Sequence, residues 1–308
     1  MGNTFVVDDM TIHTIVELQF GFLPIRQMFP NLTPEILEEN RHWLERDCLD
    51  QDDKALLCFQ SYIVRTPHHV VLIDSCVGND KPRVVPEWNM RKENTFLRGL
   101  TSLGLTVDDI DFVVCTHLHN DHVGWNTRLE NGRWVPTFPK ARYLFTATEY
   151  DFCVGTQRPP LFNDSVLPII EANQVDLVGG EHQIGDHIRF LPTPGHTPGH
   201  VAVELGRGRD SAVITGDLVH SPIQMRYPEL HFGTDHDREL ASRTRRAFFE
   251  RYRETKTLCC TMHFPSPSVG RIRAWDSGFR CEMIQADDTP FTQASRSRSS
   301  MMNQVGTP

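Results

Sequence analysis

The chain contains the stretch Thr116-His117-Leu118-His119-Asn120-Asp121-His122, which places four potential metal ligands within six residues. The preceding run, Ile110-Asp-Phe-Val-Val-Cys115, is short, apolar and β-branched, and it predicts a buried strand. Because side chains alternate along an extended backbone, His117 and His119 can point to the same side. Imidazole and carboxylate ligands together suit zinc, manganese, iron or cobalt. The sequence therefore predicts a metal site where a buried strand ends.

Three later loops repeat this pattern of an apolar run followed by a potential ligand. His196 and His200 follow residues 188–191, Asp217 follows 212–215, and His263 follows 257–261. Residues needed at a site often lie on loops that rigid strands hold in place. A catalytic zinc takes about three protein ligands, so the seven candidates that remain without His200, with one shared between ions, suit a pair of metals.

In this order, HxHxDH at 117–122, the Gly-His-Thr-Pro-Gly-His loop at 195–200, Gly216-Asp217 and the late His263 resemble the metallo-β-lactamase superfamily. The resemblance covers roughly residues 55 to 270. It implies an αββα four-layer sandwich of two mixed β-sheets flanked by helices, with the site at one edge. It also implies two divalent ions per chain, with zinc favoured. The implied division is His117, His119 and His196 for one ion, Asp121, His122 and His263 for the other, and Asp217 as the bridge.

Such a pair of ions lowers the pKa of a water held between them, so the resemblance implies a hydrolase that attacks with hydroxide. Asp121 is then expected to carry a proton to the leaving group. His220, three residues beyond Asp217, is expected to orient the substrate or stabilise an oxyanion. Asp74 ends an apolar run, and it is either a partner of a ligand histidine or a simple turn residue. His200 is expected to make structural hydrogen bonds.

The stretch Gly216-Asp-Leu-Val-His-Ser-Pro-Ile-Gln224, with His263-Phe-Pro-Ser-Pro267, is similar to the branch of quorum-quenching lactonases and methyl parathion hydrolase-like enzymes. This similarity implies opening of acyl-homoserine-lactone rings or cleavage of related esters. The alternative activities are hydrolysis of phosphotriesters, aryl esters, β-lactams or thioesters. The alternative without hydrolysis is a metal-stabilised binding protein. Lactonases of this branch often carry a Tyr shortly after the bridging Asp. Here the nearest Tyr is Tyr227, so we assign that place to His220.

The substrate is expected to enter a mostly apolar pocket, because two excursions rich in large apolar residues flank the predicted site. The expected borders are the segment 20–30, Trp125 and the excursion 218–236, with Phe20, Phe22, Met28, Phe29, Ile223 and Met225 as the contributing side chains. An apolar pocket with few polar anchors accepts an acyl chain or an aryl group.

Composition limits the partners of the chain. A net charge of −9 over 308 residues disfavours binding to nucleic acid. No apolar run reaches the length of a membrane helix, and the N-terminal residues do not form an export signal. We therefore expect a cytoplasmic protein with reduced cysteines and a small-molecule ester or lactone as substrate. Arginines between 238 and 253 alternate with glutamates and predict a solvated helix face.

Residues 1–285 are expected to form one domain. Within it, residues 1–54 form an N-terminal extension that packs on the core or joins two copies in a homodimer, and the polar tail 286–308 is expected to be disordered. The sequence also predicts a helix that begins at Pro34, a hairpin over 56–73, and helices near 96–103 and 240–252.

Overall fold

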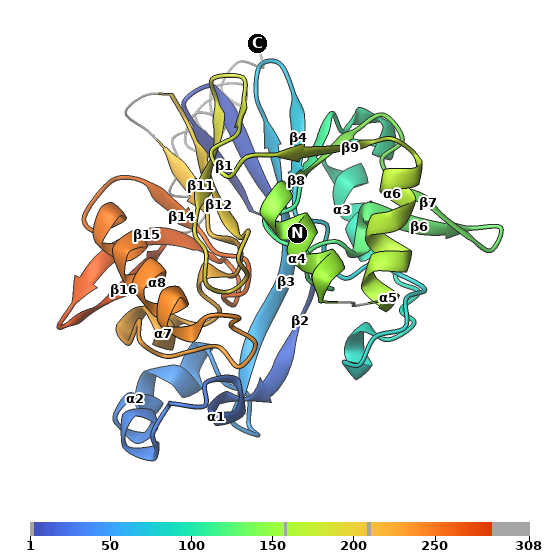
Figure 1. The fold of residues 1–308 in the computed structure, drawn as a ribbon. Coiled ribbons are helices and arrows are strands. Elements are labelled where there is room, and N and C mark those ends of the chain that lie inside the picture. Colours follow the sequence, from blue (N-terminus) through green and yellow to red (C-terminus); the bar gives the residue numbers. More distant parts are fainter. Residues whose placement is uncertain (1–2, 157–158, 208–210, 285–308) are drawn as a thin grey trace, which may run out of the picture.

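The computed structural model describes residues 3–156, 159–207 and 211–284. Two seven-stranded sheets lie face to face, and helices cover their outer faces (Figure 1). The first sheet has the strand order β1-β2-β3-β4-β5-β8-β9. Its strands are β1 (Thr4–Val7), β2 (Met10–Pro24), β3 (Lys54–Arg65), β4 (Val70–Ile73), β5 (Phe112–Val114), β8 (Arg142–Thr146) and β9 (Val175–Val178).

The second sheet follows the chain order, β10 to β16. Its strands are β10 (Gln183–Ile184), β11 (Ile188–Pro192), β12 (Val201–Leu205), β13 (Ala212–Ile214), β14 (Leu258–Cys260), β15 (Val269–Trp275) and β16 (Gly278–Met283). Both sheets are mixed, because β4, β5, β8 and β9 run parallel in the first and β13 and β14 run parallel in the second. A small separate hairpin is formed by β6 (Thr127–Glu130) and β7 (Arg133–Pro136).

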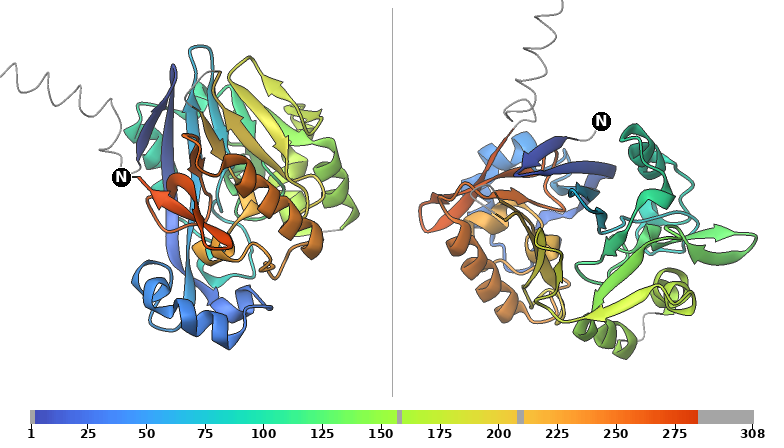
Figure 2. Two further views of the ribbon diagram at one scale, coloured as in Figure 1. Left: turned by 90° about the vertical axis from the view of Figure 1, so that its left-hand side faces the viewer. Right: turned by 90° about the horizontal axis from the view of Figure 1, so that it is seen from above.

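Helices lie on both outer faces of the sheet pair, as the two turned views in Figure 2 show. The helices are α1 (Ile25–Met28), α2 (Pro34–Asp47), α3 (Thr95–Ser102), α4 (Ala147–Gly155), α5 (Pro159–Leu161), α6 (Leu167–Glu171), α7 (Pro222–Arg226) and α8 (Arg238–Tyr252). Of these, α1 and α2 lie at the ends of β2 and β3, beyond the outer faces (Figure 1). Five short helical turns complete the set, namely η1 (Pro86–Trp88), η2 (Val107–Asp109), η3 (Gly124–Asn126), η4 (Phe162–Val166) and η5 (Gly216–Leu218). None of the helices in the described ranges has the length and apolar character needed to cross a membrane.

Separate hydrophobic clusters hold the four layers together. The cluster between the sheets joins Tyr62 of β3 to Phe190 of β11. Outside the first sheet, Phe96 of α3 belongs to a second cluster that also includes residues of α4 and α6. Outside the second sheet, Phe249 of α8 packs on Phe279 of β16. This αββα arrangement confirms the fold expected from the sequence.

The parallel strand pairs determine where the functional loops meet. Parallel neighbours end at the same edge of a sheet, so the loops after β4 and β5 emerge together, and so do those after β13 and β14. These loops begin at residues 74, 115, 215 and 261. The loop after β11 joins them, since Val201 at the start of β12 donates a backbone hydrogen bond to Thr116 O at 3.1 Å.

Helices and strands that are marked by caps, turns or apolar runs in the sequence were predicted correctly. Thr33 caps α2 by accepting a hydrogen bond from Ile36 N, and the β3–β4 hairpin forms as expected. Strands β15 and β16 were missed, because their exposed faces carry charged pairs such as Arg273 and Glu282 that hide the strand pattern. The tail 286–308 lies outside the described residues, and the homodimer and the cytoplasmic location stay predictions.

Residues 238–253 were predicted to form a solvated helix face. The prediction is wrong for Arg245 and correct for the other arginines of this segment. The Arg245 side chain of α8 is completely buried. Spacing along the sequence did not distinguish it, because its neighbours Arg243 and Arg246 are exposed.

Candidate metal centre

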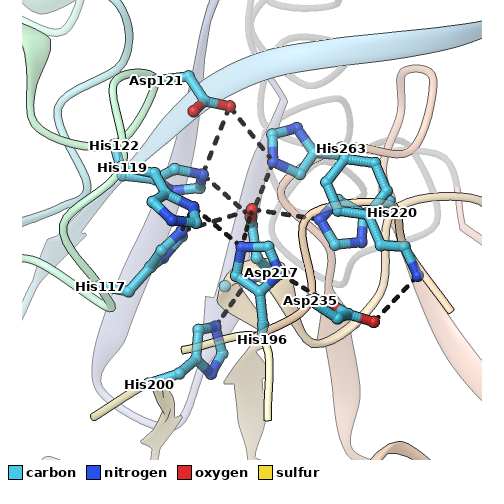
Figure 3. Close-up of polar contacts among 12 residues, drawn as sticks. His117, His119, Asp121, His122, His196, His200, Asp217, His220, Asp235 and His263 are labelled. Atoms are coloured by element: carbon cyan, nitrogen blue, oxygen red, sulfur yellow. Dashed lines mark hydrogen bonds and ion pairs between the residues drawn. The ribbon is translucent and has the colours of Figure 1, made fainter. Parts of the chain in front are cut away.

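The seven residues predicted as metal ligands converge at the shared edge of the two sheets (Figure 3). The potential ligands at this edge form three groups, and the ligand atoms within each group lie within 4.8 Å of one another. The first group contains His117, His119, His196 and Asp217, and the second contains Asp121, His122 and His263. A third group of Asp217, His220 and His263 links the other two, and the division of the ligands between two ions stays a prediction.

Asp217 lies at the centre of the cluster and turns one carboxylate oxygen toward each group. Its Oδ2 lies 3.4 Å from His117 Nε2 and 3.2 Å from His196 Nε2. Its Oδ1 lies 2.9 Å from His122 Nε2 and 2.8 Å from His263 Nε2. A carboxylate in this position can bridge two cations.

Four of the histidines are anchored through the ring nitrogen that points away from the cluster. A ring whose Nδ1–H is donated to a fixed acceptor leaves the Nε2 lone pair for a metal. The acceptors are Thr116 Oγ1 for His117 (3.1 Å), Asp74 Oδ2 for His122 (2.8 Å), Asp235 Oδ1 for His196 (2.9 Å) and Cys58 O for His263 (3.0 Å).

Asp74 is therefore a partner of a ligand histidine and not a simple turn residue. Besides His122, it accepts hydrogen bonds from Thr116 N at 2.7 Å and from Thr116 Oγ1 at 2.8 Å. It thus links the end of β4 to the start of the HxHxDH loop. The neighbouring Cys76 is fully buried beside Ser61, and burial raises the pKa of its thiol well above the usual value.

His200 has the structural role that the sequence predicted. Its Nε2 accepts a hydrogen bond from Asp217 N at 2.8 Å, while its Nδ1 lies 3.1 Å from Thr193 O. Gly216 makes this contact possible, because it has a φ of +54° and a Cβ there would lie 2.5 Å from His200 Nε2. The turn that carries Asp217 consequently depends on a glycine and on a buried histidine.

His220 lies beside the cluster, with its Nε2 3.2 Å from Asp217 Oδ2. Its ring stacks on Phe232 with 3.7 Å between centroids and 20° between planes. Burial lowers the pKa of His220 to about 4, so the imidazole is neutral near pH 7. Its Nδ1 is buried without a hydrogen-bond partner among the described residues.

The buried carboxylates of the cluster attract positive charge, because Asp217, Asp121 and Asp74 overcome the effect of burial and raise the pKa of His122 well above its usual value. Burial alone would raise the pKa of Asp217, but the rings of His122, His263 and His117 outweigh it and hold that pKa well below its usual value. Burial also lowers the pKa of His117 well below normal, so this ring is neutral and its lone pair is free to bind. His122 Nε2 is buried and lies 2.9 Å from Asp217 Oδ1, but it makes no hydrogen bond to any residue that the structure describes. A buried set of imidazoles and carboxylates with inward lone pairs fits a pair of divalent metals.

A cavity of about 400 Å³ opens beside the cluster. It borders Asp121, Asp217, His220 and His263 on one side. The rest of its lining is mainly apolar and includes Phe22, Leu23, Met28, Leu57, Phe59, Val85, Trp88 and Phe232. The volume lies in the range of small-molecule sites.

The sequence predicted part of this lining correctly. Phe22, Met28 and the 218–236 excursion do border the cavity, whereas Phe20, Phe29, Ile223 and Met225 do not. Trp125 was also wrongly predicted to border it, because its indole is buried against Phe96 and donates to Glu17 at 2.8 Å. Tyr227 points elsewhere too, since its hydroxyl accepts a hydrogen bond from Asn40.

Sequence reasoning missed several residues that build the site. Glu149 on α4 accepts hydrogen bonds from Leu118 N at 3.0 Å and from Gly199 N at 3.2 Å, so one buried carboxylate ties two ligand loops together. Asp235 holds His196, and Trp88 and Phe59 line the cavity. Of these residues, only Asp235 could have been suspected from the sequence, because it is an acid within the excursion 218–236 that was expected near the site.

Comparison with known proteins agrees with this geometry. The family model described as metallo-beta-lactamase superfamily matches residues 60–263. The chain belongs to the metallo-beta-lactamase superfamily. An N-acyl homoserine lactonase of Bacillus thuringiensis is 23% identical over 166 residues, which are 50% of this chain and 60% of that protein. A probable metallo-hydrolase of Methanocaldococcus jannaschii is 32% identical over 111 residues, or 36% of this chain and 40% of that protein.

Solved structures of this superfamily share the fold over nearly the whole chain. The dizinc quorum-quenching lactonase AidC, in complex with a product homoserine, has a TM-score of 0.75 at 20% identity and covers 92% of this chain and 97% of its own. The hydrolase AbOPH has a TM-score of 0.78 at 21% identity with the same coverage. The chain spans only 60% of the length of the curated lactonases that it matches, so their activity is carried over below as a proposal.

Proposed function

We propose that this protein is a metal-dependent hydrolase that opens acylated lactones and cleaves related esters. One observation carries the proposal, namely that Asp217 faces two sets of histidines at the edge of a largely apolar cavity. The lactonases among its relatives support the choice of substrate class.

The first cation would be held by His117, His119 and His196, and the second by Asp121, His122 and His263, with Asp217 shared. Zinc is the favoured ion, with iron, manganese and cobalt as alternatives. Two bound cations would polarise the substrate carbonyl and make a water acidic enough to attack at neutral pH.

Asp121 is suited to proton transfer. Its Oδ2 lies 3.5 Å from His122 Nε2 and 3.7 Å from His263 Nε2, and the side chain borders the cavity with 12% of its surface exposed. It can accept a proton from the attacking water and return it to the leaving alcohol. The ring-opened product would then leave with its own hydroxyl group restored.

His220 is suited to orienting the substrate. It is neutral and buried, it borders the cavity, and the stack on Phe232 restricts its ring. A neutral imidazole held in this way can donate a hydrogen bond to an oxygen that gains charge during the reaction. This is the place that a Tyr holds in many lactonases.

The aromatic wall is suited to an acyl chain. Phe59 lies 5.4 Å from the ring of His263 and 5.2 Å from Trp88, and Trp88 stacks on Phe22. The apolar surface thus begins next to the predicted ligands and continues away from them. An acyl chain would lie along this surface if its lactone ring were bound at the metal centre. Flat rings also favour aryl groups, so aryl esters and phosphotriesters form the second candidate class.

A substrate panel on zinc-reconstituted protein tests the proposal. It should contain acyl-homoserine lactones, aryl esters, phosphotriesters, thioesters and β-lactams, with a chelated sample as the control. Lactone turnover that the chelator abolishes is the expected result. Turnover of thioesters or β-lactams alone would contradict the lactonase assignment, and binding without turnover of any compound would favour a binding protein.

Elemental analysis tests the metal pair separately. Wild-type protein should hold two ions per chain at saturation, and Asp217→Ala should lose affinity for both. Asp47→Ala, which removes an exposed carboxylate on α2, is the matched control and should bind as wild type does. A wild-type protein that saturates with one ion would contradict the shared role of Asp217.

A further inference from the structure

Arg245 of α8 is a completely buried guanidinium that the sequence did not distinguish from its exposed neighbours. Removing a charge from water costs several kcal/mol unless hydrogen bonds and an opposite charge replace the solvent. Arg245 Nε donates to Leu218 O at 2.7 Å, and Nη1 donates to Pro228 O at 2.8 Å and to Leu230 O at 2.9 Å. Its Nη2 lies 3.5 Å from Asp235 Oδ2.

These acceptors belong to segments that carry the metal centre. Leu218 directly follows Asp217, so the contact to its carbonyl holds the short turn η5 that presents the central carboxylate. Asp235 is the acceptor for His196 Nδ1 at 2.9 Å (Figure 3). One guanidinium thus contacts both the turn of the shared ligand and the partner of a terminal ligand.

Asp235 contacts His196 through Oδ1 and makes a further hydrogen bond through Oδ2. Its Oδ2 accepts a hydrogen bond from Phe232 N at 2.9 Å, and the Phe232 ring stacks on His220. Both oxygens of Asp235 are therefore engaged, and the side chain is itself buried. A carboxylate fixed at both oxygens holds the imidazole of His196 in one orientation, with Nε2 toward the cluster.

We propose that Arg245 and Asp235 are positioning residues that set the metal affinity of the group His117, His119 and His196. The opposite group has its own anchor, since Asp74 accepts from His122 Nδ1. Asp74 and Asp235 come from segments far apart in the sequence, and Asp74 reaches the first group only indirectly, through Thr116 Oγ1 to His117 Nδ1. This inference rests on the proposed metal pair, and it adds that a different buried carboxylate contacts a histidine of each half directly.

The test measures zinc affinity by competition with a chromophoric chelator in two single-site backgrounds. His122→Ala keeps the half held by His196, and His117→Ala keeps the half held by His263. Asp235→Asn should weaken zinc binding about 10- to 100-fold in the first background. In the second background its effect should stay within about twofold.

Asp74→Asn is the comparison variant on the other half, and it should weaken zinc binding most in the second background, where Asp74 contacts His122 directly, and less in the first, which it reaches through Thr116. Arg246→Met changes the next residue of α8, an exposed arginine that pairs with Glu229, and should alter neither affinity. Equal losses from Asp235→Asn in both backgrounds would show a general disturbance and overturn the proposal. No loss in the first background would overturn it as well.

Arg245→Lys provides a second route if Asp235→Asn does not fold. Lysine keeps the charge but lacks the planar set of donors, so it cannot hold Leu218, Leu230 and Asp235 together. Because Arg245 also holds the turn of the shared Asp217, zinc binding should weaken in both backgrounds but more in the first, where His196 loses its orientation as well. A loss no larger in the first background than in the second would overturn the proposal. A wild-type chain that binds only one zinc would refute the metal pair instead, so the two failures are distinguishable.

Discussion

Replacing Trp88 with alanine should change how the enzyme responds to the length of an acyl chain. The indole is 7% exposed and forms part of the cavity wall. It stacks on Phe22 with 5.5 Å between centroids and 19° between planes, and it meets Phe59 edge-on at 5.2 Å. Because these rings support one another, Trp88 presents a fixed apolar surface to a bound chain.

The expected magnitude follows from burial of methylene groups. Each buried methylene contributes about 0.8 kcal/mol, which corresponds to about a fourfold gain in kcat/KM. In wild type this gain should continue with each added methylene until the cavity of about 400 Å³ is full, and then stop. In Trp88→Ala the gain should fall to about twofold per methylene, because one side of the chain loses its contact.

The measurement is kcat/KM for acyl-homoserine lactones lengthened one methylene at a time, with metal content checked for each protein. Trp43→Ala is the control, because Trp43 packs on Trp275 and does not border the cavity. It should keep the wild-type dependence on chain length. An unchanged dependence in Trp88→Ala, or no dependence in wild type, would refute the assignment of this wall to the acyl chain.

Three further predictions test other parts of the molecule. His220→Ala should lower kcat about 100-fold or more with little change in KM for lactones, and intact turnover in the metal-loaded variant would remove His220 from the reaction. Asp164→Ala leaves Arg83 buried without the partner that it contacts at 2.7 Å, and it should cost about 3 to 5 kcal/mol in chemical unfolding, whereas Asp176→Ala at an exposed ion pair should cost less than about 1 kcal/mol. Burial lowers the pKa of Lys81 to about 7, so the unfolded chain binds more protons between about pH 7 and 10. The free energy of unfolding of wild type should therefore rise with pH across that window relative to that of Lys81→Met. Parallel pH profiles of the two proteins would contradict the lowered pKa of Lys81.

The sequence was sufficient for the features that depend on local patterns. Each ligand follows a short apolar strand, and this spacing alone predicted the loops that carry His117, His196, Asp217 and His263. The αββα fold came from the resemblance that these motifs carry. The helix starting at Pro34 and the β3–β4 hairpin were also predictable, because caps and turns are decided by neighbouring residues.

The tertiary structure decided which side chains share the site with those ligands. Trp125 and Trp88 are both large apolar residues near the predicted centre, yet only Trp88 borders the cavity. Trp125 turns inward because Glu17, 108 residues away, accepts its indole hydrogen. Such a choice depends on a partner from a distant part of the chain, and no local pattern reports it.

Buried charge gives the same lesson most clearly. Arg245 and Arg246 are neighbours on α8. Arg245 points into the core where α8 packs on the second sheet, whereas Arg246 is exposed. The burial of Arg245 is stable because carbonyls of three residues and Asp235 replace the lost water. The sequence by itself determined which residues are candidate metal ligands and in which order they occur. Only the folded chain determined which buried acids hold them in place, because those partners come together when the two sheets and α8 pack.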